Sequence, residues 1–121
     1  MLILAAIPLG NPSDASANLR EAILSAKYIA AEDSRKFTRL CSDLGITYSA
    51  KLISFFEGNE TDRTSEILQL LRDGKEVLVV SDAGMPTVSD PGFRLMRDAI
   101  AENLPVSVIP GPSAPTMALA L

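Results

Sequence analysis

The stretch Val77-Leu-Val-Val-Ser-Asp-Ala-Gly-Met-Pro-Thr-Val-Ser-Asp-Pro-Gly92 decides the fold of this chain. Residues 77–80 are apolar and mostly β-branched, which is the pattern of a strand buried on both faces of a parallel sheet. Asp90 and Pro91 indicate a helix start, with a carboxylate N-cap followed by proline at the first helical position. The stretch therefore predicts the strand–loop–helix unit of an α/β protein.

The connection inside this unit, residues 81–89, is longer than the 2–6 residues usual for such loops. Long loops at the carboxyl ends of parallel strands are where open α/β sheets place their ligands. Gly84 allows unusual backbone dihedrals or a close approach to a ligand, while Pro86 and Pro91 stiffen the path. Any one of these residues also fits an ordinary connection, but the stretch as a whole favours a binding loop.

The rest of the chain repeats the same alternation of strand and helix. Strands are expected at residues 2–7, 28–31, 52–55, 77–80 and 106–109, and helices at 16–26, 34–44, 60–71, 91–102 and from 114 onward. Five strands alternating with helices predict a doubly wound α/β domain with a mainly parallel sheet, spanning residues 1–121. The apolar end, residues 114–121, has no glycine cap, so we expect a following segment to be missing.

Composition narrows the possible function. A chain of 121 residues with 47% hydrophobic and 21% charged residues forms one folded domain rather than a disordered segment. It has no apolar run near the ~18 residues of a membrane span, so we expect a soluble cytoplasmic protein. One cysteine and no histidine exclude an internal disulfide and Ser-His or Cys-His nucleophile pairs, and we expect no metal site. With 11 basic and 15 acidic residues the net charge is −4. If the substrate is a nucleic acid, we therefore expect another domain or a partner to provide much of the binding.

Three of the expected strands, the first, fourth and fifth, are followed by loops rich in glycine and proline. If these strands are neighbours in the sheet, their loops converge on one crevice, with Glu32 and Asp33 at its rim. The crevice is not a phosphate-binding loop or a dinucleotide site, because Gly10 stands alone after the first strand and no lysine follows it. A two-component receiver domain shares the fold but needs acidic residues and a lysine at strand ends that here hold Pro8-Leu9-Gly10 and Pro110-Gly111.

The chain resembles the N-terminal domain of the tetrapyrrole methylase superfamily from residue 2 to residue 121. Within it, the chain is most similar to the ribosomal RNA small-subunit methyltransferase I family, which 2′-O-methylates a ribose with S-adenosylmethionine. The resemblance rests on five motifs at expected strand ends: Ile7-Pro8-Leu9-Gly10-Asn11; Ala30-Ala31-Glu32-Asp33-Ser34-Arg35; Ser54-Phe55-Phe56-Glu57-Gly58-Asn59-Glu60; Val80-Ser81-Asp82-Ala83-Gly84-Met85-Pro86 with Val88-Ser89-Asp90-Pro91-Gly92; and Pro110-Gly111-Pro112-Ser113-Ala114.

The resemblance implies a parallel sheet in the order 3-2-4-1-5 and two domains, with the methyl donor S-adenosylmethionine in the cleft between them. This chain would be the N-terminal domain without the C-terminal one, inactive alone and a weak donor binder. Its expected partners are small-subunit ribosomal RNA, bound through the full-length protein, and a second copy of that protein. The residues expected to bind the donor are Pro8, Gly10, Asp82, Ala83, Gly84, Met85, Pro110, Gly111, Pro112 and Ser113.

The candidates for a general base are the carboxylates Glu32, Asp33 and Asp90, with Asp82 as a further possibility. The structural alternatives are that Asp90 only caps a helix and that Glu32 and Asp33 only stabilise a helix dipole. Substrate contacts are expected from Arg35, Asn59 and Glu60.

Three basic residues of the second helix, Arg35, Lys36 and Arg39, are interpreted as a solvated face, with phosphate contact as the alternative. Cys41 is interpreted as a core residue. Two other functions stay open: methylation of a small tetrapyrrole, and a non-catalytic α/β interaction module whose loops are only structural.

Overall fold

The computed structural model describes residues 1–88 and 91–121. In chain order its elements are β1 (Leu2–Ala5), η1 (Pro12–Asp14), α1 (Ala17–Ser25), β2 (Tyr28–Ala31), α2 (Ser34–Asp43), β3 (Lys51–Ser54), η2 (Glu57–Asn59), α3 (Glu60–Arg72), β4 (Val77–Val80), α4 (Phe93–Ala101), β5 (Val106–Ile109) and α5 (Ala114–Ala120).

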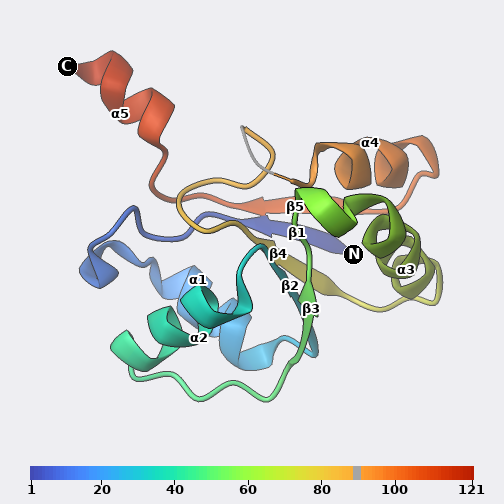
Figure 1. Cartoon of the computed structure of the whole chain (residues 1–121), viewed down its shortest axis with the longest axis horizontal. Coiled ribbons are helices and arrows are strands. Elements are labelled where there is room, and N and C mark those ends of the chain that lie inside the picture. The colour runs from blue at the N-terminus through green and yellow to red at the C-terminus, as the bar shows by residue number, and fades with distance from the viewer. Residues whose placement is uncertain (89–90) are drawn as a thin grey trace.

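The five strands form one sheet in the order β3-β2-β4-β1-β5 (Figure 1). Every pair of neighbouring strands is parallel, and Leu2 of β1 lies opposite both Val77 of β4 and Val106 of β5. Both the predicted α/β class and the strand order implied by the family resemblance are confirmed. Because all strands run the same way, the loops that follow them lie along one edge of the sheet.

Helices cover both faces of the sheet (Figure 1). On one face, α1 and α2 bury Leu19, Ile23, Phe37 and Cys41 against alternate strand residues that include Leu78. On the other face, α3 and α4 bury Ile67, Leu68, Leu71, Leu95 and Ala99 against the residues between them, such as Val77 and Val79. Strand β4 is therefore buried on both faces, as its apolar run predicted.

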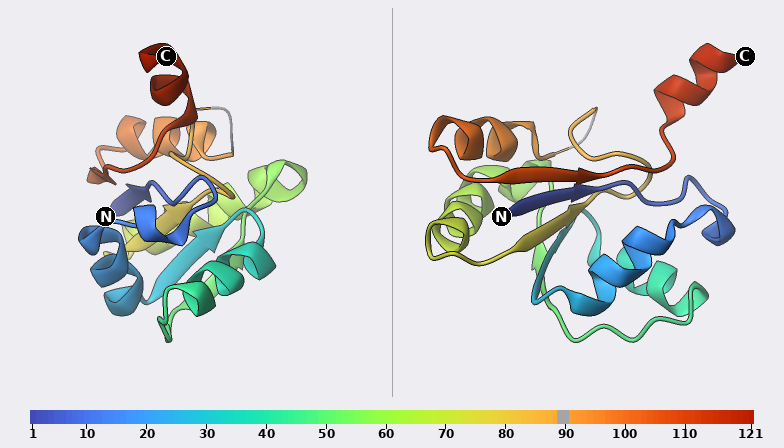
Figure 2. Two further views of the ribbon diagram at one scale, coloured as in Figure 1. Left: turned by 90° about the vertical axis from the view of Figure 1, so that its left-hand side faces the viewer. Right: turned by 180° about the vertical axis from the view of Figure 1, so that it is seen from behind.

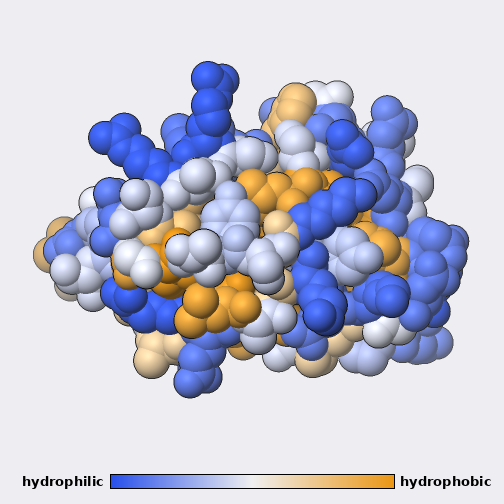
Figure 3. Space-filling view, turned by 90° about the horizontal axis from the view of Figure 1, so that it is seen from below, coloured by the Kyte–Doolittle hydropathy of each residue, from blue (hydrophilic) through white to orange (hydrophobic). Residues whose placement is uncertain are grey.

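The last two elements are much less covered than the rest. Strand β5 is an edge strand that pairs only with β1, and Val108 at its centre is half exposed. Helix α5 has no buried residue and projects from the body of the molecule (Figure 2). On the face seen in Figure 3, by contrast, apolar side chains appear only in separate patches among hydrophilic ones. Among the described residues, no helix combines the length and hydrophobicity needed to cross a membrane.

Two element boundaries differ by two residues from those expected, and the others differ by at most one. Helix α4 begins at Phe93 rather than at Pro91, because Gly92 has a positive φ of 121° that no helical residue adopts. The expected cap, Asp90, lies outside the described residues. Strand β1 ends at Ala5 rather than at Ile7, because Ile7 leaves the parallel ladder and forms an antiparallel bridge with Gly84.

Candidate functional site

The loops after β1, β4 and β5 are joined by backbone hydrogen bonds at the carboxyl edge of the sheet. Ile7 N donates to Gly84 O at 3.1 Å, and Gly84 N donates to Ile7 O at 3.0 Å. Ala6 N donates to Ile109 O at 3.2 Å, which connects the first loop to the end of β5. These bonds use main-chain groups alone, so they fix the path of the loops independently of the side chains.

Gly84 is the point at which the three loops meet. Its φ is +71°, and a Cβ atom on it would lie 3.1 Å from Leu9 Cδ2 and 3.5 Å from Pro112 O. Gly111 is as tightly placed, since a Cβ there would lie 2.9 Å from Ala6 Cβ. The loops therefore approach one another at positions where only glycine fits without a shift.

The turn after β4 is held from inside by Ser81, which is buried. Its Oγ lies 3.0 Å from Ala83 O and 3.2 Å from Gly84 O and can donate its hydrogen to either carbonyl. The hydroxyl thus gives the carbonyls of this turn a hydrogen-bond donor. The two backbone bonds with Ile7 hold the same turn against the β1 loop.

A cavity of about 230 Å³ opens where the β1 and β4 loops face helix α2. Four of the ten predicted donor-binding residues line it: Pro8, Gly10, Asp82 and Ala83. The other six do not: Gly84 is buried at the loop junction, Met85 is half-buried, and Pro110, Gly111, Pro112 and Ser113 lead into α5. The structure therefore brings the predicted loops together, but only part of their predicted donor-binding residues line this cavity.

Helix α2 supplies one wall of this cavity, although its basic residues were expected to form a solvated face, with phosphate contact as the alternative. The wall consists of Lys36, Arg39, Leu40 and Asp43. Their spacing of i, i+3, i+4 and i+7 is that of one helical face, and this face is distinct from the one that carries Phe37 and Cys41. The spacing of these four residues can be read from the sequence. Only the fold shows that their side of the helix faces the β1 and β4 loops.

A second cavity, of about 510 Å³, lies on the other side of Asp82, at the ends of β2 and β3. Its lining includes Glu32, Asp33 and Arg35 from the predicted site, together with Ser34, Ser54 and Phe56. Asp82 lies between the two cavities and lines both: its backbone N–H donates to Glu32 Oε1 at 3.0 Å, and its Oδ2 lies 3.3 Å from Lys36 Nζ.

Three predicted catalytic or substrate residues make hydrogen bonds that hold the local structure or join two loops. Asp33 caps α2 by accepting hydrogen bonds from Arg35 N at 2.9 Å and Lys36 N at 3.4 Å. Asn59 accepts from Phe56 N at 2.9 Å and donates to Ser54 O at 3.1 Å, and Glu60 Oε1 accepts from Gly92 N at 3.3 Å. Arg35, also a predicted substrate contact, lies with its side chain exposed at the start of α2, and Asp90 falls outside the described residues.

The one thiol of the chain is buried in the core, as predicted, and burial raises the pKa of Cys41 to about 11. It is therefore protonated at neutral pH and is no nucleophile. In residues 1–88 and 91–121 no group of three or more histidine, cysteine, aspartate or glutamate side chains is arranged to hold a metal ion.

Residues 1–121 match the family described as Tetrapyrrole (Corrin/Porphyrin) Methylases. The chain belongs to this family. Its relatives include the ribosomal RNA small subunit methyltransferase I of Mycobacterium tuberculosis, with 44% identity over 120 residues, and that of Thermotoga maritima, with 41% identity over 120 residues. The protein of the same name from Halalkalibacterium halodurans is 38% identical over 118 residues.

These alignments cover nearly all of this tetrapyrrole methylase chain, 99%, 99% and 98% respectively, but much less of the relatives. They cover 42%, 53% and 40% of the three proteins. The chain thus spans about half the length of the curated relatives it matches.

Proposed function

We propose that this chain is the N-terminal domain of an S-adenosylmethionine-dependent methyltransferase that modifies a ribose 2′-hydroxyl of small-subunit ribosomal RNA. The observation that carries the proposal is the meeting of the β1, β4 and β5 loops at Gly84, at the edge where parallel sheets bind ligands. Family membership supports methyl transfer, and the names of the relatives support ribosomal RNA as the substrate.

The chemistry of the smaller cavity fits part of a methyl donor. The donor has a sulfonium cation, an adenosine and an amino-acid end, which require a largely apolar slot with a few fixed polar groups. Leu9, Pro12 and Leu40 supply the apolar surface, and two carboxylates (Asp43 and Asp82) and two cations (Lys36 and Arg39) supply polar groups of both signs, which suits the zwitterionic amino-acid end of the donor. The cavity is smaller than the ~300 Å³ at which ligand pockets commonly begin, so we expect a second domain to complete it.

The role of the protein in methyl transfer is mainly to position the acceptor. The reaction is an in-line displacement, so holding the hydroxyl behind the methyl group supplies much of the acceleration. A ribose hydroxyl is a weak nucleophile, and the carboxylates of Glu32 and Asp33 line the cavity next to the donor slot, where either can accept its proton. Asp90, which lies outside the described residues, remains a candidate for the same role.

The proposal extends to the partners of the full-length protein. The unpaired outer edge of β5 and the exposed apolar side chains of Val108, Met117 and Leu119 are surfaces that a second domain or a second subunit would cover. We propose that the protein is a homodimer that acts in the cytoplasm. The net charge of −4 further suggests that the C-terminal half provides much of the affinity for RNA.

Titration with the demethylated product, S-adenosylhomocysteine, tests the donor slot. We expect weak binding by the chain and a loss of more than about tenfold in the Gly84→Val variant, because the new side chain would contact Leu9 and the Pro112 carbonyl. Gly74→Val is the matched control: φ of Gly74 is +80°, but no atom lies within 4 Å of its added Cβ. Equal product affinity in folded Gly84→Val and in the unmodified chain would instead favour a non-catalytic module.

Incubation of small-subunit RNA with labelled donor tests the reaction. We expect methylation only when the chain is extended by the length that its relatives possess, and the product should resist alkaline cleavage at one linkage because its 2′-hydroxyl is blocked. Turnover by the 121-residue chain alone would contradict the two-domain arrangement. A methylated base, with alkaline cleavage intact, would contradict the ribose as acceptor.

A further inference from the structure

Three of the four lysines of the chain lie together at the amino edge of the sheet, opposite the edge that holds the two cavities described above. Lys27 directly precedes β2, Lys51 is the first residue of β3, and Lys75 lies two residues before β4. A single exposed lysine is common on proteins and needs no explanation. These three differ because their strands are neighbours in the order β3-β2-β4, so the lysines form a row.

The backbone holds this amino-edge row in place. Lys51 N donates to Lys27 O at 2.9 Å, and Lys75 N donates to Leu70 O at 2.9 Å. Because neighbouring strands lie about 4.8 Å apart, the row spans roughly 10 Å. All three side chains are exposed, so their ammonium groups can reach a ligand from solvent.

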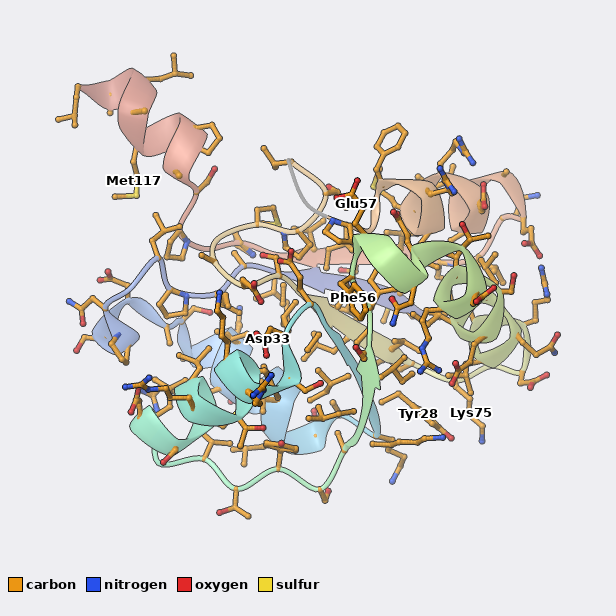
Figure 4. The ribbon with its side chains drawn as sticks, viewed as in Figure 1. Tyr28, Asp33, Phe56, Glu57, Lys75 and Met117 are labelled. Atoms are coloured by element: carbon orange, nitrogen blue, oxygen red, sulfur yellow. The ribbon has the colours of Figure 1, made fainter. Side chains whose placement is uncertain are left out.

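A cavity of about 360 Å³ opens between the turns that precede β2 and β4. It is lined by Ser25, Lys27, Tyr28, Gly74, Lys75 and Glu76. Figure 4 shows Tyr28 and Lys75 beside each other at this edge, with Asp33 and Phe56 toward the other end of the sheet. Tyr28 also pairs with Lys51 in the sheet, so the third lysine of the row is next to the wall of the cavity.

The positive charge of the row is not neutralised within the protein. The ion pairs of residues 1–88 and 91–121 involve four other basic residues, Lys36, Arg63, Arg72 and Arg97. The cavity itself has two ammonium groups in its lining and one carboxylate, that of Glu76. In a chain with a net charge of −4, this edge therefore stands out as a place that attracts anions.

The shape of the row indicates which anion it takes. A lysine ammonium binds a phosphate oxygen as a compact point charge and does not require one fixed geometry. One free phosphate is too small to contact three ammonium groups distributed over roughly 10 Å. Successive phosphates of a nucleic-acid strand present negative charge along a line, which matches a row of lysines.

We propose that Lys27, Lys51 and Lys75 bind the phosphate backbone of single-stranded RNA, at the edge of the sheet away from the methyl-transfer site. The inference rests on the proposed function, because it takes RNA as the ligand. Contacts to phosphate fix the position of a nucleic acid but do not read its bases. The row therefore adds affinity for RNA without any preference for sequence, and Glu76 opposes it.

The salt dependence of RNA binding tests the proposal. Oligouridylate of ~8 nucleotides is titrated into the chain, and we expect the NMR signals of residues 25–28 and 74–76 to shift. Counterion release from three phosphates should contribute about −2 to the slope of log affinity against log salt, so a fourfold rise in salt should weaken binding about twentyfold. Each of Lys27→Gln, Lys51→Gln and Lys75→Gln should reduce the steepness of this slope by about 0.7.

Two further variants control for net charge. Arg97→Gln removes one positive charge from an exposed position on α4, outside the cavity, and should leave the salt slope unchanged. Glu76→Gln removes the opposing carboxylate and should tighten RNA binding about twofold to fivefold. Oligoadenylate of the same length should show the same effect of each variant as oligouridylate, because the row does not read bases.

Three results would overturn the proposal: a salt slope that all three lysine variants leave unchanged, no shift at residues 25–28 and 74–76, or binding of inorganic phosphate as tight as that of RNA. Oligoglutamate that binds as tightly as RNA would instead assign the row to an acidic protein and would equally overturn it. Product binding separates this proposal from the proposed function. The triple lysine variant should bind S-adenosylhomocysteine normally, and Gly84→Val should keep the salt slope of the unmodified chain.

Discussion

The carboxyl edge of the sheet has two halves that are built differently. The loops after β1, β4 and β5 are joined by backbone hydrogen bonds between Ile7, Gly84, Ala6 and Ile109. The loops after β2 and β3 share one backbone bond, from Phe55 N to Ala31 O, and are otherwise held by side chains: Glu32 accepts from the backbone of Asp82, and Asn59 bridges its own turn.

The difference predicts how each half responds to mutation. Where two backbones are in contact, a side chain added to a glycine cannot be accommodated by a rotamer change. Substitution of such a glycine therefore shifts the backbones of both loops. Where side chains bridge, one bond can be lost while the backbone keeps its course. The half formed by the β1, β4 and β5 loops therefore suits a binding site of fixed shape, as a methyl donor requires. In the half formed by the β2 and β3 loops, single side chains can change without a change of the backbone.

Substitution of Gly111 should have the largest effect on stability. A Cβ there would lie 2.9 Å from Ala6 Cβ, which is itself buried just after β1, so we expect Gly111→Ala to lower the free energy of unfolding by about 1–3 kcal/mol. Gly58→Ala is the matched control in the other half, where the clash is with the movable Phe56 ring, and should cost less than about 0.5 kcal/mol. Urea denaturation measures both, and equal losses would remove the distinction between the halves.

The stability of the chain at alkaline pH tests whether the Cys41 thiol of α2 is buried as the structure shows. Burial raises the pKa of Cys41 from an ordinary value of 9.0 to about 11, so the folded state holds the thiol proton more tightly than the unfolded state. Stability from this group is complete below pH 9 and is lost as the pH rises to 11. At pH 10 the loss should be about 1.4 kcal/mol relative to neutral pH.

The comparison with Cys41→Ala isolates this loss from the titration of lysine and tyrosine. The variant should be less stable at neutral pH, but its unfolding free energy should fall less between pH 8 and 10 than that of the unmodified chain. A parallel decline in both proteins would mean that α2 exposes its thiol to solvent.

The helix cap at the end of β2 should have a smaller effect. Asp33→Ala removes the acceptor for Arg35 N and Lys36 N and should cost about 1 kcal/mol of stability, whereas Asp33→Asn keeps a capping oxygen and should cost only a few tenths. Thermal or urea unfolding of the two variants measures the difference. If Asn destabilises as much as Ala, the charge of Asp33 rather than its capping oxygen stabilises the second half.

The ion pair between Lys36 and Asp82 should contribute least. The two side chains are 3.3 Å apart but 64% and 30% exposed, so solvent screens their attraction. Lys36→Met, which keeps most of the apolar stem, should change the unfolding free energy by less than about 0.5 kcal/mol, and added salt should reduce even this. A loss above 1 kcal/mol would show that the ion pair, and not the backbone bonds, holds the boundary between the halves.

Much of the fold could be predicted from local patterns. Strands β2, β4 and β5 have the predicted limits, because short apolar runs between turn residues have few alternatives. Ser16 caps α1 through its bond from Leu19 N, and Gly45 ends α2 with a φ of +69°, both as expected. The errors at β1 and α4 lie where the chain contacts residues far away in the sequence: Ile7 pairs with Gly84, and Gly92, which has a positive φ, donates to Glu60.

The candidate site was less accessible to sequence reasoning. The convergence of the three glycine-rich loops could be predicted only by assuming that the first, fourth and fifth strands are neighbours. The sheet confirms that strand order. The wall formed by Lys36 and Arg39 was not foreseen, because a charged helical stripe in water and one facing a loop have the same spacing.

By itself the sequence determined which segments are strands and helices, which residues are buried, and where the chain can turn. These properties depend on side-chain periodicity and on the dihedral freedom of single residues, both of which act over a few positions. Only the tertiary structure decided that one edge of the sheet has two cavities, that Asp82 separates them, and that Phe56 rests on Gly58 beside carboxylates from another strand. Those relations depend on the packing of five strands side by side, and no local pattern encodes the distance between neighbouring strand ends.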